Sequence, residues 1–447
     1  MARSKQNSSQ DDGRRNSPGR REFLKSSLAL TCATGLVTRA LNFESAGASE
    51  AWTEWGFPLP YKAVSQKSVD WLKSKGWWPL QVGWNPLWSD GNLLLFVMRQ
   101  QKFLEKRGVE VRYSPFLQAG LMNEVYIPAK VQVVQAGALG LLAVIDRQIP
   151  TLALACYPVQ RQAFMVHPDS PIKSLSDLKN QRVLKRPAVI GVSIGSSQHL
   201  GLIVAAKVLG LEEGKDFLTK NSIAPDMITM PSGLDVVVMF EPNVILMEEF
   251  IKNARVIDLT DNYAFFNGYS YMRGEIEEGA PDVVQAYMDA LIESLLYARL
   301  KPADSVAAFS EDDSQRGRNP KLIERDAIIH VFNPKPTKYY PFEDVNGLWV
   351  QLEAYQAGIL AEAGVLRRRY AEQDIKAVFR PKYMADTFAR LGWSVPARPP
   401  FLPPDWPGKI RHPPYPPYGL MTLGKQKFPE PGDLIRDWTF GGTTYKA

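Results

Sequence analysis

The sequence predicts an α/β protein of two lobes, followed by a helical region and a proline-rich tail. Short apolar segments alternate with segments of helical periodicity, and this alternation occurs in two separate series, at 78–160 and 161–260. Strands that alternate with helices form a mostly parallel sheet with helices on both faces. The 447 residues, 45% of them hydrophobic and 22% charged, are enough to bury the cores of two such lobes.

The first series starts at Trp78, after a leader at 49–77 that we expect to lie on the folded body. A predicted strand at 80–83 runs into a loop at 84–91, and apolar residues then recur at helical spacing until Gly108 ends the helix. The remaining strands of this series are expected at 109–113, 130–134 and 151–156, the last of them after a helix at 139–147.

The second series repeats the pattern of strand, turn and helix. A strand at 189–193 leads through Gly195 and Ser196 into an apolar helix, and later strands are expected at 236–240 and 256–259. A long helix at 281–300 should return the chain to the first lobe. The crossings between the lobes are therefore predicted near 158–161 and 259–263.

The region after the second series is predicted to be helical and then extended. Residues 261–395 hold the return to the first lobe and further helices, including 349–362 and 374–379. Ten prolines fall within 396–417, which removes backbone donors and excludes a helix. The tail at 396–447 is thus expected to be extended, either packed on the body or as a solvated linker.

Residues 1–48 have the features of an export signal. Residues 20–25 read Arg-Arg-Glu-Phe-Leu-Lys, close to the core of a twin-arginine signal, and a mildly apolar stretch follows at 28–41. Residues 46–48 are Ala-Gly-Ala, which a signal peptidase accepts, so the mature chain should start near Ser49. The prediction is a periplasmic protein that meets the twin-arginine translocon during export; the alternative is a disordered basic tail.

Composition argues against several other classes of protein. The net charge is +6, but residues 1–48 carry eight basic and four acidic residues, so the remainder is near neutral and no nucleic-acid partner is expected. Two cysteines, Cys32 and Cys156, cannot form a disulfide framework or a structural zinc site. No metal or cofactor is predicted, because none of the histidines has ligand spacing: His167, His199, His330 and His412.

Three segments resemble the nitrate/sulfonate/taurine type of periplasmic solute-binding proteins of ABC importers. Residues 169–179 read Asp-Ser-Pro-Ile-Lys-Ser-Leu-Ser-Asp-Leu-Lys, residues 195–199 read Gly-Ser-Ser-Gln-His, and residues 233–242 read Gly-Leu-Asp-Val-Val-Val-Met-Phe-Glu-Pro. The resemblance covers roughly 78–300. It implies a type 2 periplasmic-binding fold, a monomer that closes its lobes on a small solute, and a membrane permease as partner.

The residues expected to bind the solute follow the carboxyl ends of predicted strands, where ligands bind in open α/β sheets. They are Trp84, Asn85, Trp88, Gln135, Gly137, Ser196, Ser197 and Glu241. The helix start at Ser196 and Ser197 would bind a carboxylate, sulfonate or other oxyanion through backbone N–H groups, although plain helix capping is an equal alternative. The two tryptophans could also be packing residues. The expected solute is a small anion or anion-bearing molecule of the sulfonate, nitrate, taurine or aromatic acid class.

Catalysis is the main alternative to binding. A desulfinase on this fold would need a cysteine in the first-strand loop, where Asn85 stands, and a pyrimidine synthase would need a cysteine-rich stretch. No Ser-His-Asp order, paired acid motif or phosphate loop is present, so a non-enzymatic binding protein is predicted. A sensor or partner protein that keeps the fold is a third possibility. Arg161, near the first crossing, is expected to lie on the surface.

Overall fold

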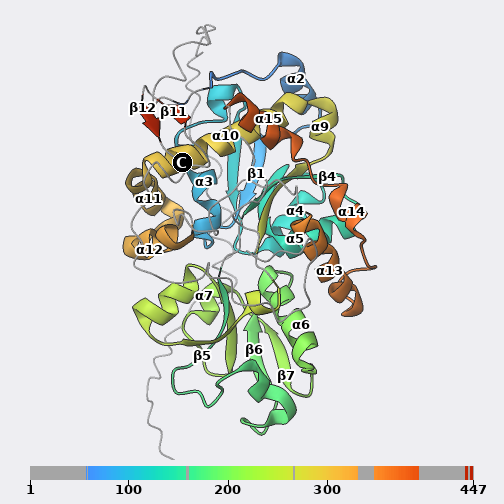
Figure 1. Ribbon diagram of the computed structural model, residues 1–447, viewed down its shortest axis with the longest axis vertical. Helices are drawn as coiled ribbons and strands as arrows, with labels where there is room; N and C mark the ends of the chain where they lie inside the picture. The colour runs from blue at the N-terminus through green and yellow to red at the C-terminus, as the bar shows by residue number, and fades with distance from the viewer. Residues whose placement is uncertain are drawn as a thin grey trace, which may run out of the picture. The chain divides into compact units, whose positions relative to one another are not determined.

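The computed structural model describes most of the chain between residues 57 and 391. The described residues are 57, 59–157, 161–264, 267–330, 347–391, 438–440 and 443–445. The predicted export signal and most of the proline-rich tail therefore lie outside them. Two five-stranded sheets organise the described chain (Figure 1).

The first sheet has the strand order β2-β1-β3-β10-β4. β1 pairs parallel with β2 and β3, whereas β10 pairs antiparallel with β3 and β4. A strand from the second half of the chain thus lies inside a sheet made by the first half. The strands are β1 (Leu80–Trp84), β2 (Val111–Pro115), β3 (Val133–Gly137), β4 (Thr151–Tyr157) and β10 (Gly268–Arg273).

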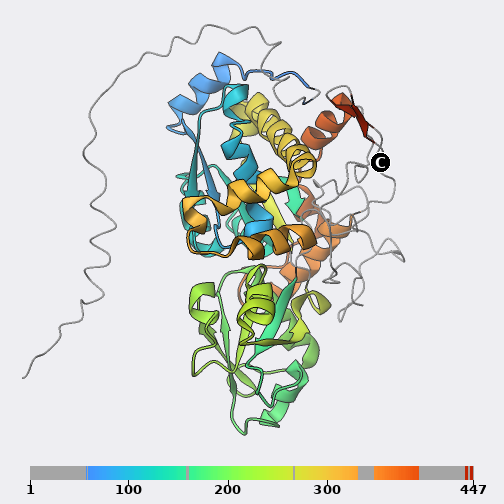
Figure 2. The same ribbon diagram turned by 90° about the vertical axis from the view of Figure 1, so that its left-hand side faces the viewer.

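Helices cover both faces of the first sheet. On one side α3 packs against three helices from the later chain (Figures 1 and 2). These are α3 (Ser89–Gln100), α10 (Pro281–Leu300), α11 (Pro302–Ser310) and α12 (Pro320–His330). On the other side, α4 (Ala119–Tyr126) and α5 (Ala138–Asp146) pack on β3. Short helices connect the elements: η2 (Glu105–Arg107), α9 (Glu275–Gly279) and η6 (Asp313–Gln315).

The second sheet has the order β7-β6-β8-β5-β9 and is formed by one continuous stretch of chain. β6 pairs parallel with β7 and β8, and β5 pairs antiparallel with β8 and β9. Its strands are β5 (Gln162–Val166), β6 (Ala188–Val192), β7 (Phe217–Asn221), β8 (Val236–Phe240) and β9 (Arg255–Leu259). Its helices are η3 (Leu175–Gln181), α6 (Ser197–Leu209), α7 (Ala224–Met227), α8 (Asn243–Ile245), the π-helix η4 (Leu246–Ile251) and η5 (Thr260–Asn262).

The predicted α/β class with two lobed sheets is confirmed. The chain leaves the first sheet after residue 157 and enters the second at 162, and it leaves the second after 259 and re-enters the first at 268. One strand was placed wrongly, because the expected 130–134 is β3 at Val133–Gly137. The prediction ended the strand at residue 134 because Gln135 is polar. In the structure Gln135 is fully buried in β3, which lies between β1 and β10, so the strand continues beyond the apolar residues.

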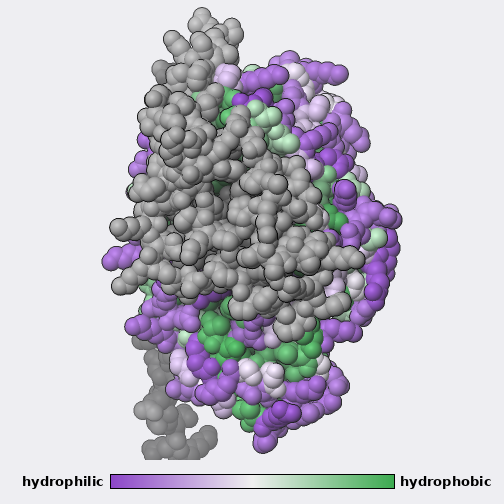
Figure 3. Space-filling model, viewed as in Figure 1, coloured by the Kyte–Doolittle hydropathy of each residue, from purple (hydrophilic) through white to green (hydrophobic). Residues whose placement is uncertain are grey.

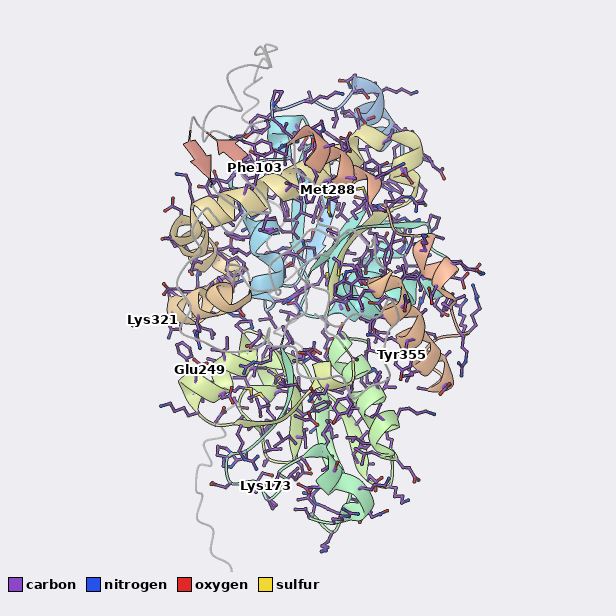
Figure 4. The ribbon with its side chains drawn as sticks, viewed as in Figure 1. Phe103, Lys173, Glu249, Met288, Lys321 and Tyr355 are labelled. Atoms are coloured by element: carbon purple, nitrogen blue, oxygen red, sulfur yellow. The ribbon has the colours of Figure 1, made fainter. Side chains whose placement is uncertain are left out.

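Among the described residues, helices of the later chain contact helices of the second sheet. α13 (Leu348–Glu362) packs on both α5 and α6, and Lys207 of α6 forms an ion pair with Glu362, Nζ to Oε2 3.1 Å. Elsewhere, Arg325 of α12 pairs with Glu249 of η4 at 3.3 Å; Glu249 and the α13 residue Tyr355 are labelled in Figure 4. α13 is followed by α14 (Glu372–Lys376) and α15 (Lys382–Arg390).

The leader is more ordered than the sequence suggested. It contains α2 (Gln66–Ser74), which starts where the Ser65 hydroxyl accepts a hydrogen bond from Ser68 N at 3.3 Å. Tyr61 is buried and donates to Glu293 Oε1 at 2.7 Å, and Arg107 Nη1 lies 2.6 Å from the other oxygen of that carboxylate. The hydrogen bond from Tyr61 thus attaches the leader to α10, at a carboxylate that also forms a buried ion pair with Arg107.

The remaining described residues of the tail form a short antiparallel hairpin, β11 (Trp438–Phe440) and β12 (Thr443–Tyr445). Within the described chain, no helix is both long and apolar enough to cross a bilayer.

Hydrophobic patches lie among hydrophilic side chains on the visible part of the second sheet's body (Figure 3). Its exposed large hydrophobic residues are Ile194, Leu218, Phe250 and Ile251.

Candidate functional site

A cavity lies between the two sheets, at the carboxyl ends of their parallel strands. From the first sheet's side it is lined by residues that follow or end β1, β2 and β3, namely Asn85, Trp88, Leu117, Gln118, Met122 and Gly137. From the second sheet's side it is lined by Gln162, Ser193, Ser196, Ser197, Gln198 and Phe240. Parallel strands place their carboxyl ends on one edge, so loops from six strands converge here.

Four of the described helices begin at this cavity. The N-cap residues of α3, α4, α5 and α6 are Trp88, Gln118, Gly137 and Ser196, and all four line it. The first N–H groups of a helix have no partner within the helix, and the helix dipole places partial positive charge there. The first three N-caps make no side-chain capping bond. The first N–H of α5, at Ala138, donates instead to the carbonyl of Asn267 at 3.1 Å.

Hydrogen bonds hold the loop after β1 from two sides. Asn92 of α3 donates from Nδ2 to the carbonyls of Asn85 at 2.6 Å and Trp88 at 2.7 Å, and Gln315 donates to the carbonyl of residue 86 at 2.8 Å. The Asn85 oxygen Oδ1 accepts from a backbone N–H two residues ahead at 2.9 Å. The Nδ2 group of Asn85 has no hydrogen-bond partner in the described chain, which makes it a donor that can serve a ligand.

The indole of Trp88 is enclosed by two glycines. A Cβ atom on Gly91 would lie 2.0 Å from the indole, and one on Gly268 would lie 2.2 Å from it, both far inside van der Waals contact. Gly268 is the first residue of β10, directly after the chain returns from the second sheet. The ring is therefore fixed between α3 and β10 while Trp88 lines the cavity.

The two serines at the start of α6 have different roles. Ser196 caps the helix, because its hydroxyl accepts from His199 N at 3.4 Å and donates to the Ser193 carbonyl at 2.5 Å. The hydroxyl of Ser197 is buried and has no partner among the described residues. Burial lowers the pKa of His199, so its imidazole is neutral at neutral pH. Ser197 thus supplies a side-chain donor, and no protonated histidine supplies charge.

No charged side chain is among the described residues that line the cavity. A cluster of ion pairs is formed by the sequence neighbours of two lining residues, Gln162 and Phe240. Arg161 Nε lies 2.5 Å from Glu241 Oε1 and Arg161 Nη1 lies 3.2 Å from Glu248. The other Glu241 oxygen accepts from Ile245 N at 3.0 Å. The expectation of a surface Arg161 is wrong, since the residue is 5% exposed. Nowhere in the described ranges could three or more His, Cys, Asp or Glu side chains hold a metal ion.

Five of the eight residues expected at the site lie around the cavity, and three do not. Trp84 is the last residue of β1, 3% exposed, with its ring 6.4 Å from that of Phe96 and 5.5 Å from the Arg99 guanidinium. Gln135 is inside β3 and Glu241 is in the ion cluster. Both Trp84 and Gln135 fall within strands that extend further than their apolar pattern, which places them in the core rather than in a loop.

Other lining residues were not predicted. Gln118 follows β2, Ser193 follows β6, and Gln162 opens β5, with Gln198 held through its Nε2 to the Val238 carbonyl at 2.6 Å. The rule that ligands bind beyond the carboxyl ends of strands would have pointed to Gln118 and Ser193, because both follow parallel strands. Gln162 is the first residue of an antiparallel strand and lies outside that rule.

Comparison with known proteins identifies the fold. The structure is similar to the nitrate-binding protein NrtA of Synechocystis PCC 6803, with a TM-score of 0.57 and 14% identity, over 82% of this chain and 95% of that one. It is also similar to the alkanesulfonate-binding protein SsuA of Xanthomonas axonopodis pv. citri bound to MOPS, with a TM-score of 0.54 and 15% identity, over 68% of this chain and 98% of that one. The fold is that of a periplasmic binding protein.

The aliphatic sulphonate binding protein SsuA of Escherichia coli shares this periplasmic-binding-protein fold, with a TM-score of 0.53 and 16% identity over 66% of this chain and 90% of that one. The resemblance drawn from sequence motifs therefore agrees with the structural neighbours. No family model matches the sequence, and no curated protein matches it significantly. Identities this low establish the fold and not the solute.

Proposed function

We propose that this chain is the solute-binding component of an ABC importer, working in the periplasm, and that it binds a small anion or anion-bearing organic molecule in the cavity between its two sheets. The observation that carries the proposal is the convergence of four helix N-termini on a cavity whose described lining is uncharged. Helix starts bind anions without a full positive charge. A neutral lining also leaves the anion free to dissociate toward a permease.

The size of the cavity favours a solute of a few heavy atoms in the enclosed part. Its volume is ≈ 50 Å³. One water needs roughly 10–15 Å³ of such space, so the cavity has room for about four waters or a small polar head group. Leu117, Ala119, Met122 and Ala224 form an apolar part of the lining that suits a short carbon chain.

The chemistry of the lining agrees with the ligands of the structurally similar proteins. NrtA is a nitrate-binding protein and the two SsuA proteins bind sulfonates, both oxyanion groups. Ser197 Oγ, Asn85 Nδ2 and the helix-start N–H groups are donors suited to an oxyanion. We infer a solute of the sulfonate, nitrate, taurine or aromatic acid class, bound without chemical change.

Closure of the two sheets around the solute is the proposed motion. Among the described strands, the main chain passes from the first sheet to the second after Tyr157 and returns after Leu259, and two such connections suit a hinge. The ion pairs Arg325–Glu249 and Lys207–Glu362 would then strengthen as the sheets approach. We propose a monomer that delivers its solute to a membrane permease.

A panel of anions tests the proposed function. Nitrate, sulfate, acetate, ethanesulfonate, taurine and benzoate are added to the mature chain, and a rise in melting temperature marks binding to the native state. Calorimetry then gives the Kd of each anion that binds. A neutral sugar or alcohol that binds more tightly than every anion would show that the cavity has been assigned the wrong chemistry.

Two serine variants separate binding from helix capping. Ser197→Ala removes an unpartnered buried hydroxyl and should weaken binding by about 1–2 kcal/mol, which is roughly 5- to 30-fold in Kd, with little change in stability. Ser176→Ala, at an exposed serine of η3, is the matched control and should leave the Kd unchanged. An unchanged Kd in Ser197→Ala would contradict the role of this hydroxyl.

Export is tested separately. Changing Arg20 and Arg21 to lysine should leave the precursor in the cytoplasm if the chain uses the twin-arginine route, and cell fractionation reports the result. Undiminished periplasmic yield of the double variant would contradict that route without bearing on solute binding.

A further inference from the structure

A cluster of buried polar side chains lies outside the lining of the cavity, and the proposed function does not use it. Glu353 of α13 accepts hydrogen bonds at Oε1 from Asn267 Nδ2 at 3.0 Å and from the Tyr269 hydroxyl at 2.9 Å. Gln356, three residues further along α13, and Cys156 of β4, whose Sγ lies 3.8 Å from Asn267 Nδ2, complete the Glu353 cluster. Asn267, Tyr269, Glu353 and Gln356 are all fully buried.

The hydrogen bonds of this cluster are unbalanced. Glu353 Oε2, Asn267 Oδ1 and Gln356 Oε1 are buried acceptors without a donor in the described chain. Gln356 Nε2 is likewise without an acceptor there. A proton on Glu353 converts Oε2 from an acceptor into a donor, and an acceptor on the same helix face lies three residues away at Gln356. The neutral acid therefore fits the cluster better than the carboxylate does.

A short path of bonds connects the Glu353 cluster with the cavity. The carbonyl of Asn267 accepts a hydrogen bond at 3.1 Å from Ala138 N, the first residue of α5. The N-cap of that helix, Gly137, lines the cavity. Asn267 thus bonds the α5 start with its carbonyl and Glu353 with its amide. A charge on Glu353 is separated from a bound anion by one helix start and one asparagine.

We propose that binding of an anion in the cavity is coupled to uptake of a proton by Glu353. The inference rests on the proposed function, because it requires an anion at the four helix starts. Two like charges on the order of 10 Å apart, at an effective dielectric constant of about 20, change each other's equilibria by roughly tenfold. Linkage is reciprocal, so an anion favours the protonated acid and the protonated acid favours the anion.

The proton exchanges in the range of pH where the coupling can be observed. Burial raises the pKa of Glu353 to about 7. The hydrogen bonds from Asn267 and Tyr269 favour the charged form and lower the pKa, but by less than burial raises it. Among the described residues, no charged group contributes to this shift of the pKa. Tyr269 and Cys156 are the titratable groups that face it from β10 and β4. The other titratable groups described on the elements packed around α13 are Asp146, His199, Lys207, Tyr271, Arg273, Glu372, Asp374 and Lys376.

The test measures ethanesulfonate and nitrate binding by calorimetry between pH 6 and pH 8.5, a range in which neither anion titrates. The wild-type Kd should rise by about tenfold over this range, and at pH 7 the binding enthalpy should depend on the ionisation enthalpy of the buffer. Glu353→Gln mimics the neutral acid, so it should keep the low-pH affinity throughout and show no buffer dependence. Glu124→Gln, at an exposed carboxylate of α4, is the matched control and should behave as wild type.

Infrared spectroscopy supplies a readout on Glu353 itself. A carbonyl band of a protonated carboxyl group should disappear as pH rises in wild type, should shift to higher pH when ethanesulfonate binds, and should be absent from Glu353→Gln. Tight binding with a Kd that does not change with pH, or a band that the anion leaves in place, overturns the coupling while the proposed function stands. Absence of binding at every pH for all six anions of the panel, nitrate, sulfate, acetate, ethanesulfonate, taurine and benzoate, overturns both.

Discussion

Replacing Gly268 by alanine should disturb the cavity through Trp88. The new Cβ would lie 2.2 Å from one indole carbon and 2.9 Å from the next, where an ordinary contact is at least about 3.4 Å. The ring cannot move away toward α3, because Gly91 already approaches it so closely that a Cβ there would lie at 2.0 Å. The remaining direction is into the cavity that Trp88 lines.

The expected cost is that of overpacking a buried site, about 1–3 kcal/mol in the free energy of unfolding. Urea denaturation measures this loss, and calorimetry with ethanesulfonate measures the accompanying loss of affinity. Gly268→Ala combined with Trp88→Phe should recover part of the stability, because the smaller ring vacates the space that the new Cβ needs. Such recovery is the coupling expected of residues in contact.

Gly120→Ala is the matched control. Gly120 lies in α4 close to Gln118, and a Cβ there would meet no atom within 4 Å. This substitution should be neutral or stabilise the helix by about 0.5–1 kcal/mol. If Gly268→Ala has the same free energy of unfolding and the same Kd for ethanesulfonate as Gly120→Ala, the indole of Trp88 is not confined between the two glycines.

Two further predictions concern stability. Glu293→Gln leaves the buried Arg107 guanidinium without its anion and should lower the free energy of unfolding by about 3–5 kcal/mol. The control is Asp313→Asn, in the exposed ion pair with Arg316, which should lower it by less than about 1 kcal/mol. Equal losses for the two variants in urea denaturation would contradict the buried ion pair. Ionisation of Glu353 should make the native state less stable as pH rises. The carboxyl group of Glu353 ionises near pH 4.5 in the unfolded chain and near pH 7 in the folded chain. Between these pH values the free energy of unfolding of wild type should therefore fall by about 3 kcal/mol relative to that of Glu353→Gln. A difference between the two proteins that does not change with pH would contradict the buried, protonated carboxyl group.

The fold could be predicted from sequence because its pattern is local and repeated. β8 at Val236–Phe240 and α10 at Pro281–Leu300 begin and end where the apolar runs and their flanking residues indicate. β3 was displaced because Gln135 is polar, and only the neighbours β1 and β10 explain why an amide is buried there. β10 is more than a hundred residues away from β3 and β4 in the sequence, so its pairing with them cannot be predicted from local hydrophobic periodicity.

The site could be predicted only in part, for a related reason. Ser196 and Gly137, which line the cavity, could be named from sequence because each directly precedes a helix, and a helix start is visible in sequence. Glu241 looked equally suitable at the end of a strand, but its partner Arg161 is 80 residues away in the chain. Whether a polar residue at a strand end faces a cavity or a buried ion pair depends on such distant partners.

The position of β10 has a consequence for the order in which the protein can be assembled during synthesis. The strands of the second sheet all lie within 162–259, so that sheet can form as soon as this stretch is available. The first sheet stays open until residues 268–273 arrive, because β3 and β4 have no other common neighbour. Until then both strands present unpaired edges, which invite misassociation. The part of the chain made first is therefore completed last.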